Sequence, residues 1–149
     1  MTSVHEFDDF IRDGNIWVKA VMDRLGTDDV HAAYLVLRAT LHALRDRIPA
    51  ESAVHLGAQL PTIIRGTYFE NWHMARTPTK ERHLAPFLDH VKKGIPAGLN
   101  VDVAQASRAV FEVMSDRIDH AEIAKVVRML PLELRELWPV LVQVDAAEK

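Results

Sequence analysis

Apolar residues recur every three or four positions along much of the chain, which is the spacing of one face of an α-helix. The longest such stretch covers about five turns, and its apolar positions are Val30, Ala33, Tyr34, Leu37, Leu41, Leu44 and Ile48. An earlier helix should run from its expected cap, Asn15, to Leu25 and end in a left-handed turn at Gly26. Over residues 3–13 we expect only a short helical lead-in, which Gly14 interrupts. The pattern predicts an all-α protein.

The same pattern returns at an offset of 70 residues without a gap. The identical residues at this offset are Arg38-Ala39 and Arg108-Ala109, Asp46-Arg47-Ile48 and Asp116-Arg117-Ile118, Leu60-Pro61 and Leu130-Pro131, and Arg65 and Arg135. Tyr68 corresponds to Trp138. Agreement through three consecutive segments indicates an internal duplication. We predict repeats over about residues 15–68 and 85–138, with a polar connector over residues 69–84.

Each repeat should contain three helices, and the third carries a proline at the same place in both halves. The apolar stripe continues in phase past Pro61 and past Pro131, although an interior proline costs a helix about 3 kcal/mol. We therefore expect a kink or a break there. Asp119 and Glu122 have the spacing of a capping box at the start of the third helix of repeat two. A unit of about 60 residues has a marginal core, so the two repeats should pack as one pseudo-symmetric bundle of six to eight helices over residues 1–149.

Several segments together resemble a known family. They are Asn15 and Trp17, then LRATLHALRDRIP, LGAQLP and RGTYFENWH. The chain resembles the bacterial domain of unknown function family 2267, and the resemblance covers nearly its whole length. This implies an all-helical, intracellular prokaryotic protein, and it brings no agreed activity and no catalytic motif.

Composition narrows the possible functions. Apolar residues make up 48% and charged residues 26% of the 149 positions, as in an ordinary globular domain. The chain has no cysteine, which excludes disulfides, cysteine-ligated metals and a thiol nucleophile. The N-terminal segment MTSVHEFDD is acidic rather than apolar, and no apolar run approaches the ~20 residues of a membrane span. We expect a cytoplasmic protein without a membrane partner.

The charge pattern disfavours nucleic acid as a partner without excluding it. The formal net charge is −3, and basic residues are scattered among acids. The alternative requires the fold to gather a basic face, for which the candidates are Arg38, Arg45, Arg76, Lys80 and Arg82.

Polar residues present in only one repeat are the best binding candidates, because the shared fold does not require them. The candidate binding patch is Arg38, which repeat two shares as Arg108, together with His42, Arg45, His55, Gln59, Tyr68, Trp72 and His73. The corresponding residues of repeat two include Glu112, Ser115, Lys125 and Met129. A patch of this composition suits another protein or a small anion. The alternative is a solvated helix face, with the aromatic residues covering the core.

Arg65 and Arg135 occur in both repeats and have two interpretations. Asp46 and Asp116 lie at helix C-termini, where the dipole disfavours their carboxylates, and need a partner. Arg65 and Arg135 could supply it, as could Arg47 and Arg117 or Arg38 and Arg108. Alternatively, both guanidinium groups could grip one anion at the pseudo-twofold axis.

Catalytic and metal-binding signatures are missing. His83 and His90 lie seven residues apart, but no acidic ligand accompanies them at helical spacing. The sequence has no dinucleotide fingerprint, no phosphate-binding loop and no nucleophile elbow. We therefore assign no catalytic residue, metal or cofactor.

The sequence favours a non-catalytic bacterial binding protein, an adaptor or regulator with a stress-related role. Its partner should be another protein or a small anionic ligand. The alternatives left open are a nucleic-acid-binding regulator, and a small enzyme or a protein that binds a metal or ligand.

Overall fold

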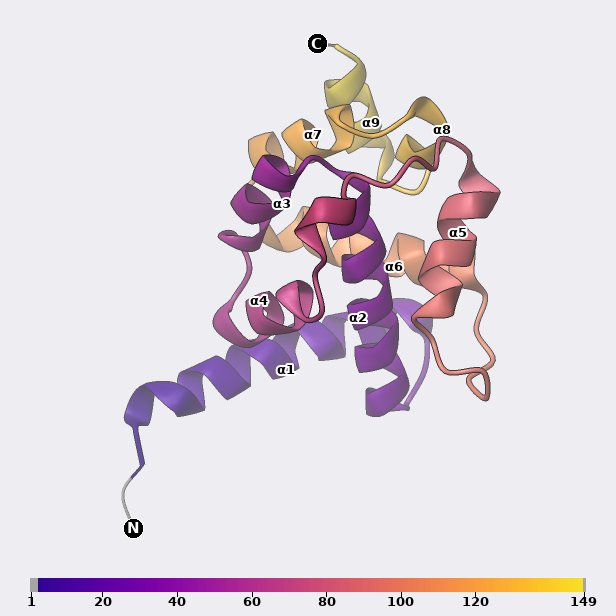
Figure 1. Cartoon of the computed structure of the whole chain (residues 1–149). Helices are drawn as coiled ribbons and strands as arrows, with labels where there is room; N and C mark the ends of the chain where they lie inside the picture. Colours follow the sequence, from indigo (N-terminus) through magenta and orange to yellow (C-terminus); the bar gives the residue numbers. More distant parts are fainter. Residues whose placement is uncertain (1–2, 149) are drawn as a thin grey trace.

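The computed structural model describes residues 3–148, which contain α-helices, one 3-10 helix and no strand (Figure 1). The elements are α1 (His5–Leu25), α2 (Val30–Arg47), α3 (Ala50–Gly57), α4 (Thr62–Phe69), η1 (Met74–Arg76), α5 (Leu84–Lys93), α6 (Val103–Arg117), α7 (His120–Arg128), α8 (Leu132–Arg135) and α9 (Val140–Ala147). The prediction of an all-α bundle is confirmed. The expected six to eight helices were too few, because these residues form nine α-helices. None of these helices combines the length and apolar character needed to cross a membrane.

Helix α2 lies at the centre of the bundle (Figure 1). It packs against α1, α3, α4, α5 and α6, and twelve of its eighteen residues are buried. Alanines supply many of these positions, which allows neighbouring helices to approach closely. Asp29 caps the helix by accepting a hydrogen bond from the backbone N–H of Ala32 at 3.0 Å.

The expected interruption at Gly14 was wrong, because α1 runs unbroken from His5 to Leu25. A glycine inside a helix costs about 1 kcal/mol relative to alanine. Gly14 is buried against Ile63 of α4, where an added Cβ would lie in ordinary contact at 3.4 Å. The packing of α1 on α4 therefore accommodates Gly14 inside the helix despite its low helix propensity. Gly26 ends the helix as expected, with φ of 70° and its N–H donating to the Met22 carbonyl.

Both interior prolines break their helices completely rather than kinking them. Pro61 has φ −65° and ψ 157°, and α4 begins at the next residue. Pro131 has φ −57° and ψ 152°, and α8 begins at the next residue. These extended conformations place each proline at a helix N-cap, where its missing N–H leaves no hydrogen bond unmade.

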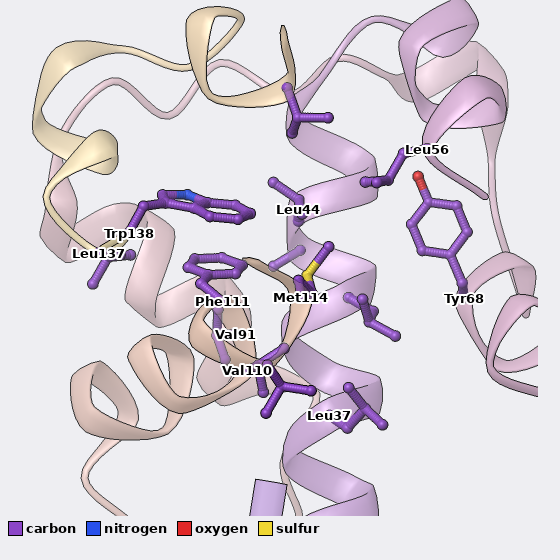
Figure 2. Packing of buried hydrophobic residues seen from close by; sticks show 14 of the residues in the cluster. Leu37, Leu44, Leu56, Tyr68, Val91, Val110, Phe111, Met114, Leu137 and Trp138 are labelled. Carbon is purple, nitrogen blue, oxygen red and sulfur yellow. The ribbon is translucent and has the colours of Figure 1, made fainter. Parts of the chain in front are cut away.

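The core joins α2 to α6 and is closed by aromatic side chains on two sides (Figure 2). On one side the rings of Phe111 and Trp138 stack, with centroids 4.1 Å apart and planes 5° apart. On the other side Tyr68 is fully buried, and its hydroxyl donates to the Ala53 carbonyl at 2.7 Å. Leu44 of α2 lies between these two aromatic groups (Figure 2). The aromatic side chains therefore fasten α4 and the segment after α8 to the central pair of helices.

Replacing Trp138 tests this closure. We expect Trp138→Ala to lower the free energy of unfolding by about 3–5 kcal/mol, because the ring is buried and its loss leaves a cavity beside Phe111. Urea denaturation followed by far-ultraviolet circular dichroism measures the change. Val140→Ala, at an exposed position of α9, is the control and should change it by less than about 0.5 kcal/mol. Equal effects of the two substitutions would contradict this account of the core.

Candidate functional site

The predicted binding patch divides among three places in the structure. Arg38, His42 and Arg45 share one stripe of α2, which faces the end of α4. His55 lies on α3 and Gln59 in the turn that follows it, and both face α7. The remaining three, Tyr68, Trp72 and His73, lie at the end of α4 and in the segment after it.

The polar side chains of the α2 stripe bind the end of α4 instead of presenting a polar surface. Arg45 is only 3% exposed, and its Nη1 donates to the carbonyls of Tyr68 at 2.8 Å and Glu70 at 2.7 Å. His42 donates from Nε2 to the Thr67 carbonyl at 2.7 Å. These three carbonyls lie in the last turn of α4 and just after it, so the stripe satisfies oxygen atoms that the helix leaves unpaired. Burial lowers the pKa of His42, although its bond to Thr67 acts in the opposite direction.

Two members of the predicted patch cannot contact a partner at this surface. Arg45 is buried and Tyr68 is fully buried, so their assignment to an exposed patch was wrong. Burial also raises the pKa of Tyr68 above its ordinary value. Arg38 is half-buried, with its guanidinium 5.9 Å from the centre of the Tyr34 ring. The helical period placed these residues on one face, but it could not indicate which segment covers that face.

Trp72 and His73 lie after α4. Trp72 is half-buried against the core, with its ring centroid 5.5 Å from that of Phe69. His73 is exposed. The interpretation that Trp72 helps to cover the core agrees with this packing, and only its outer part faces solvent.

A second polar group anchors the segment between α4 and α5. His90 of α5 lies between two carboxylates, with Nε2 3.3 Å from Asp46 Oδ2 and Nδ1 3.1 Å from Glu81 Oε2. Arg47 donates to the Glu81 carbonyl at 2.6 Å, and the Thr79 N–H donates to the Asp46 carbonyl at 2.7 Å. The end of α2 thereby binds both the connector and α5.

Proximity changes the pKa values within this group. The hydrogen bond to Asp46 raises the pKa of His90, against the effect of burial, and Glu81 adds to the rise. Burial alone would raise the pKa of Asp46, but His90 and Arg45 together lower it. Protonated His90 is therefore held by two carboxylates in the folded protein.

Arg65 and Arg135, the predicted donors to a bound anion, instead donate hydrogen bonds to backbone carbonyls. Arg65 donates from Nε to the Gly57 carbonyl and from Nη2 to the Leu60 carbonyl, at 3.0 and 2.8 Å. Arg135 donates from Nε to the Leu130 carbonyl and from Nη2 to the Arg128 carbonyl, at 3.0 and 3.1 Å. Each guanidinium thus caps the helix that precedes its proline. Asp46 and Asp116 pair instead with His90 and Arg24.

His83 and His90, the histidines considered as a metal pair, contact different carboxylates. His83 Nδ1 lies 2.8 Å from Glu133 Oε2, whereas His90 lies against Asp46 and Glu81. Over residues 3–148, no group of three or more histidine or acidic side chains has an arrangement that could hold a metal ion.

An open groove between α3 and α7 is the candidate functional site. Its volume is about 280 Å³, and the residues that line it are Glu51, Ser52, His55, Leu56, Gln59, Glu122, Lys125, Val126 and Met129. Leu56 and Val126 are buried and form the apolar floor. Met129 is 48% exposed and extends this apolar surface towards solvent. The groove is thus apolar at its base and polar along its rim.

Glu122 connects the charges of the rim. Its Oε2 lies 3.3 Å from His55 Nδ1, and its Oε1 lies 3.5 Å from Lys125 Nζ. The predicted capping box is wrong, because Asp119 makes no side-chain cap and Glu122 serves this rim instead. The arrangement offers hydrogen-bond donors and acceptors around an apolar base.

The groove brings His55 and Gln59 together with Lys125 and Met129, the residues that occupy the same positions 70 residues later. Comparing the two halves of the sequence selected His55 and Gln59 as candidates, but it treated Lys125 and Met129 only as their counterparts. The 70-residue offset relates these four residues, but it indicates a shared site only when α3 and α7 are known to be neighbours. Figure 1 shows these two helices side by side at one end of the bundle.

The fold and this site define an all-helical protein with a candidate groove between two short helices. Residues 14–137 match the family described as "Uncharacterized conserved protein (DUF2267)", and the chain belongs to that family. The resemblance to family 2267 is therefore confirmed. Comparison with curated proteins finds no match.

The His90 group predicts a pH-dependent contribution to stability. Because folding raises the pKa of His90, its contribution is complete below the unfolded value of 6.5 and is lost as the pH rises through the folded value. We expect His90→Gln to be less stable than the unmodified protein by about 1 kcal/mol near pH 6, and by less near pH 9. Urea unfolding at both pH values measures the two differences. His42 is present in both proteins, so its opposite effect cancels.

His73→Gln is the control, because His73 is an exposed histidine of the connector. It should change stability little at either pH. A stability difference for His90→Gln that stays constant between about pH 6 and pH 9 would contradict the role given to its charge.

Proposed function

We propose that this protein is a non-catalytic adaptor or regulator that binds another protein through the groove between α3 and α7. The observation that carries the proposal is an apolar base, Leu56 and Val126, surrounded by polar side chains from both helices. Energetically important residues of protein interfaces are commonly apolar or aromatic anchors seated in such a depression. The partner would place one anchor residue against the base.

The size of the groove favours a side chain over a complete small molecule. Its volume of about 280 Å³ lies just below the ~300–1,000 Å³ of typical ligand pockets. The groove is also open along its length, between helices of eight and nine residues. A single anchor residue with its flanking backbone suits these dimensions.

The rim favours a protein over a small anion. Lys125 and His55 are the basic side chains of the groove, and Glu122 contacts both. A bound anion would have to displace this carboxylate or lie beside it. A protein partner can instead form hydrogen bonds around the rim, and exposed charge pairs of this kind contribute specificity more than affinity.

Nucleic-acid binding, the principal alternative, has weaker support. Arg45, one of its five candidate cations, is buried and bonded to carbonyl oxygens. The formal net charge of −3 also opposes the electrostatic attraction on which most such binding depends.

We further propose that the groove lies where two copies of one helical unit, over residues 15–68 and 85–138, meet. The matching backbone angles at Pro61 and Pro131 and the matching bonds of Arg65 and Arg135 support a duplication. The packing of α1 on α6 and of α5 on α2 also supports it, because each unit exchanges a helix contact with the other. In this interpretation α3 and α7 are equivalent helices, and differences such as His55 and Lys125 were selected after duplication.

A charge placed in the groove tests the proposed function. We expect Met129→Glu to reduce capture of specific partners from a bacterial lysate by at least about tenfold, because it puts a carboxylate in place of an apolar side chain beside the base. Affinity purification with quantitative mass spectrometry compares this variant with the unmodified protein. Leu141→Glu changes an exposed apolar residue of α9 and is the matched control. Partners retained equally by all three proteins would remove the groove as the binding site.

A further inference from the structure

The N-terminal half of α1 projects from the bundle as an arm (Figure 1). The apolar stripe of α1 is covered where the helix crosses the body, since Trp17 and Val21 are buried. The same stripe continues along the arm without a cover, where Phe7 is 57% and Ile11 is 53% exposed. Because these residues follow the helical spacing of three and four, one face of a single helix passes from buried to exposed.

Neighbouring side chains widen this apolar surface. Phe10 lies beside Phe7, with ring centroids 6.1 Å apart. Ile63 of α4 is 40% exposed and packs beside Gly14, which lies on the same stripe. We name the surface formed by Phe7, Phe10, Ile11 and Ile63 the arm face.

Acidic residues border the arm face on both sides. At 100° per residue, Glu6 and Asp13 lie along one edge of the stripe and Asp8 lies along the other. Residues 3–14 contain four carboxylates and one cation, Arg12, with a formal net charge of −3 when His5 is neutral. Arg12 is already paired with Asp9 at 3.0 Å and with Asp13 at 3.8 Å.

We propose that the arm face is a docking surface for a basic amphipathic helix of another protein. An apolar stripe between two acidic edges complements a helix whose apolar stripe lies between lysines or arginines. A second copy of this chain fits less well, because two arm faces in contact would bring acidic edges together. An anionic membrane surface would repel the same carboxylates.

This surface is separate from the groove between α3 and α7, so a binding experiment can distinguish the two. The probe is a synthetic peptide of about 18 residues with leucines on one helical face and lysines elsewhere. Two control peptides accompany it, one with the same composition in scrambled order and one with glutamate in place of lysine. Fluorescence anisotropy with the full chain at about 0.1 M salt gives the Kd of each.

We expect the amphipathic lysine peptide to bind at least about tenfold more tightly than either control peptide. Phe7→Ser combined with Ile11→Ser should weaken this binding at least about tenfold, because it removes the apolar contact. Glu6→Lys combined with Asp8→Lys should also weaken it, and the loss should shrink at higher salt. Met129→Glu, in the groove, should leave it unchanged.

Two groups of results would overturn the proposal. The first is equal binding of the scrambled peptide, or binding that neither double substitution alters. The second is a different occupant, such as a dimer in sedimentation experiments that Phe7→Ser with Ile11→Ser dissociates, or association with vesicles of anionic lipid. All substituted residues of the arm are exposed, and thermal unfolding verifies that both variants retain the fold.

Discussion

The burial of α2 is the constraint on which the rest of the structure depends. A helix covered on nearly every side has little access to water, so the charged side chains at its C-terminal end need partners within the protein. Arg45 meets this requirement by binding the carbonyl oxygens at and beyond the end of α4. Asp46 meets it through His90 of α5, and Arg47 through the Glu81 carbonyl in the segment before α5. The route of the chain from α4 to α5 therefore follows from polar groups that the central helix must satisfy.

Much of the fold could be predicted from local sequence, because its signals act over a few residues. Helical spacing identifies α2, and the left-handed turn at Gly26 ends α1. Pro61 separates α3 from α4, because a proline cannot donate the backbone hydrogen bond that a helix interior needs. Gly14 shows the limit of such reasoning. The expected interruption there was wrong, because Gly14 contacts Ile63, 49 residues away, and no local pattern reports that contact.

The candidate site could be predicted only in part, and for a related reason. The difference in sequence between the two halves of the chain selected His55 and Gln59 as binding candidates. The same comparison selected Arg45, because a periodic pattern identifies a face of a helix without identifying what packs on it. Glu122 was assigned to its own helix terminus, although its contacts are with the groove rim. Residues whose roles depend on long-range contacts were therefore the ones misread.

Because α1 is unbroken, one helix connects the projecting arm to the body of the bundle. Its 21 residues form a rod about 31 Å long, with Phe7 near one end and Arg24 near the other. Arg24 forms ion pairs with Glu112 and Asp116 of α6, and Trp17 lies between them in the core. These ion pairs join α1 to α6 at the opposite end of the helix from Phe7. The single helix α1 therefore connects the arm face directly to α6.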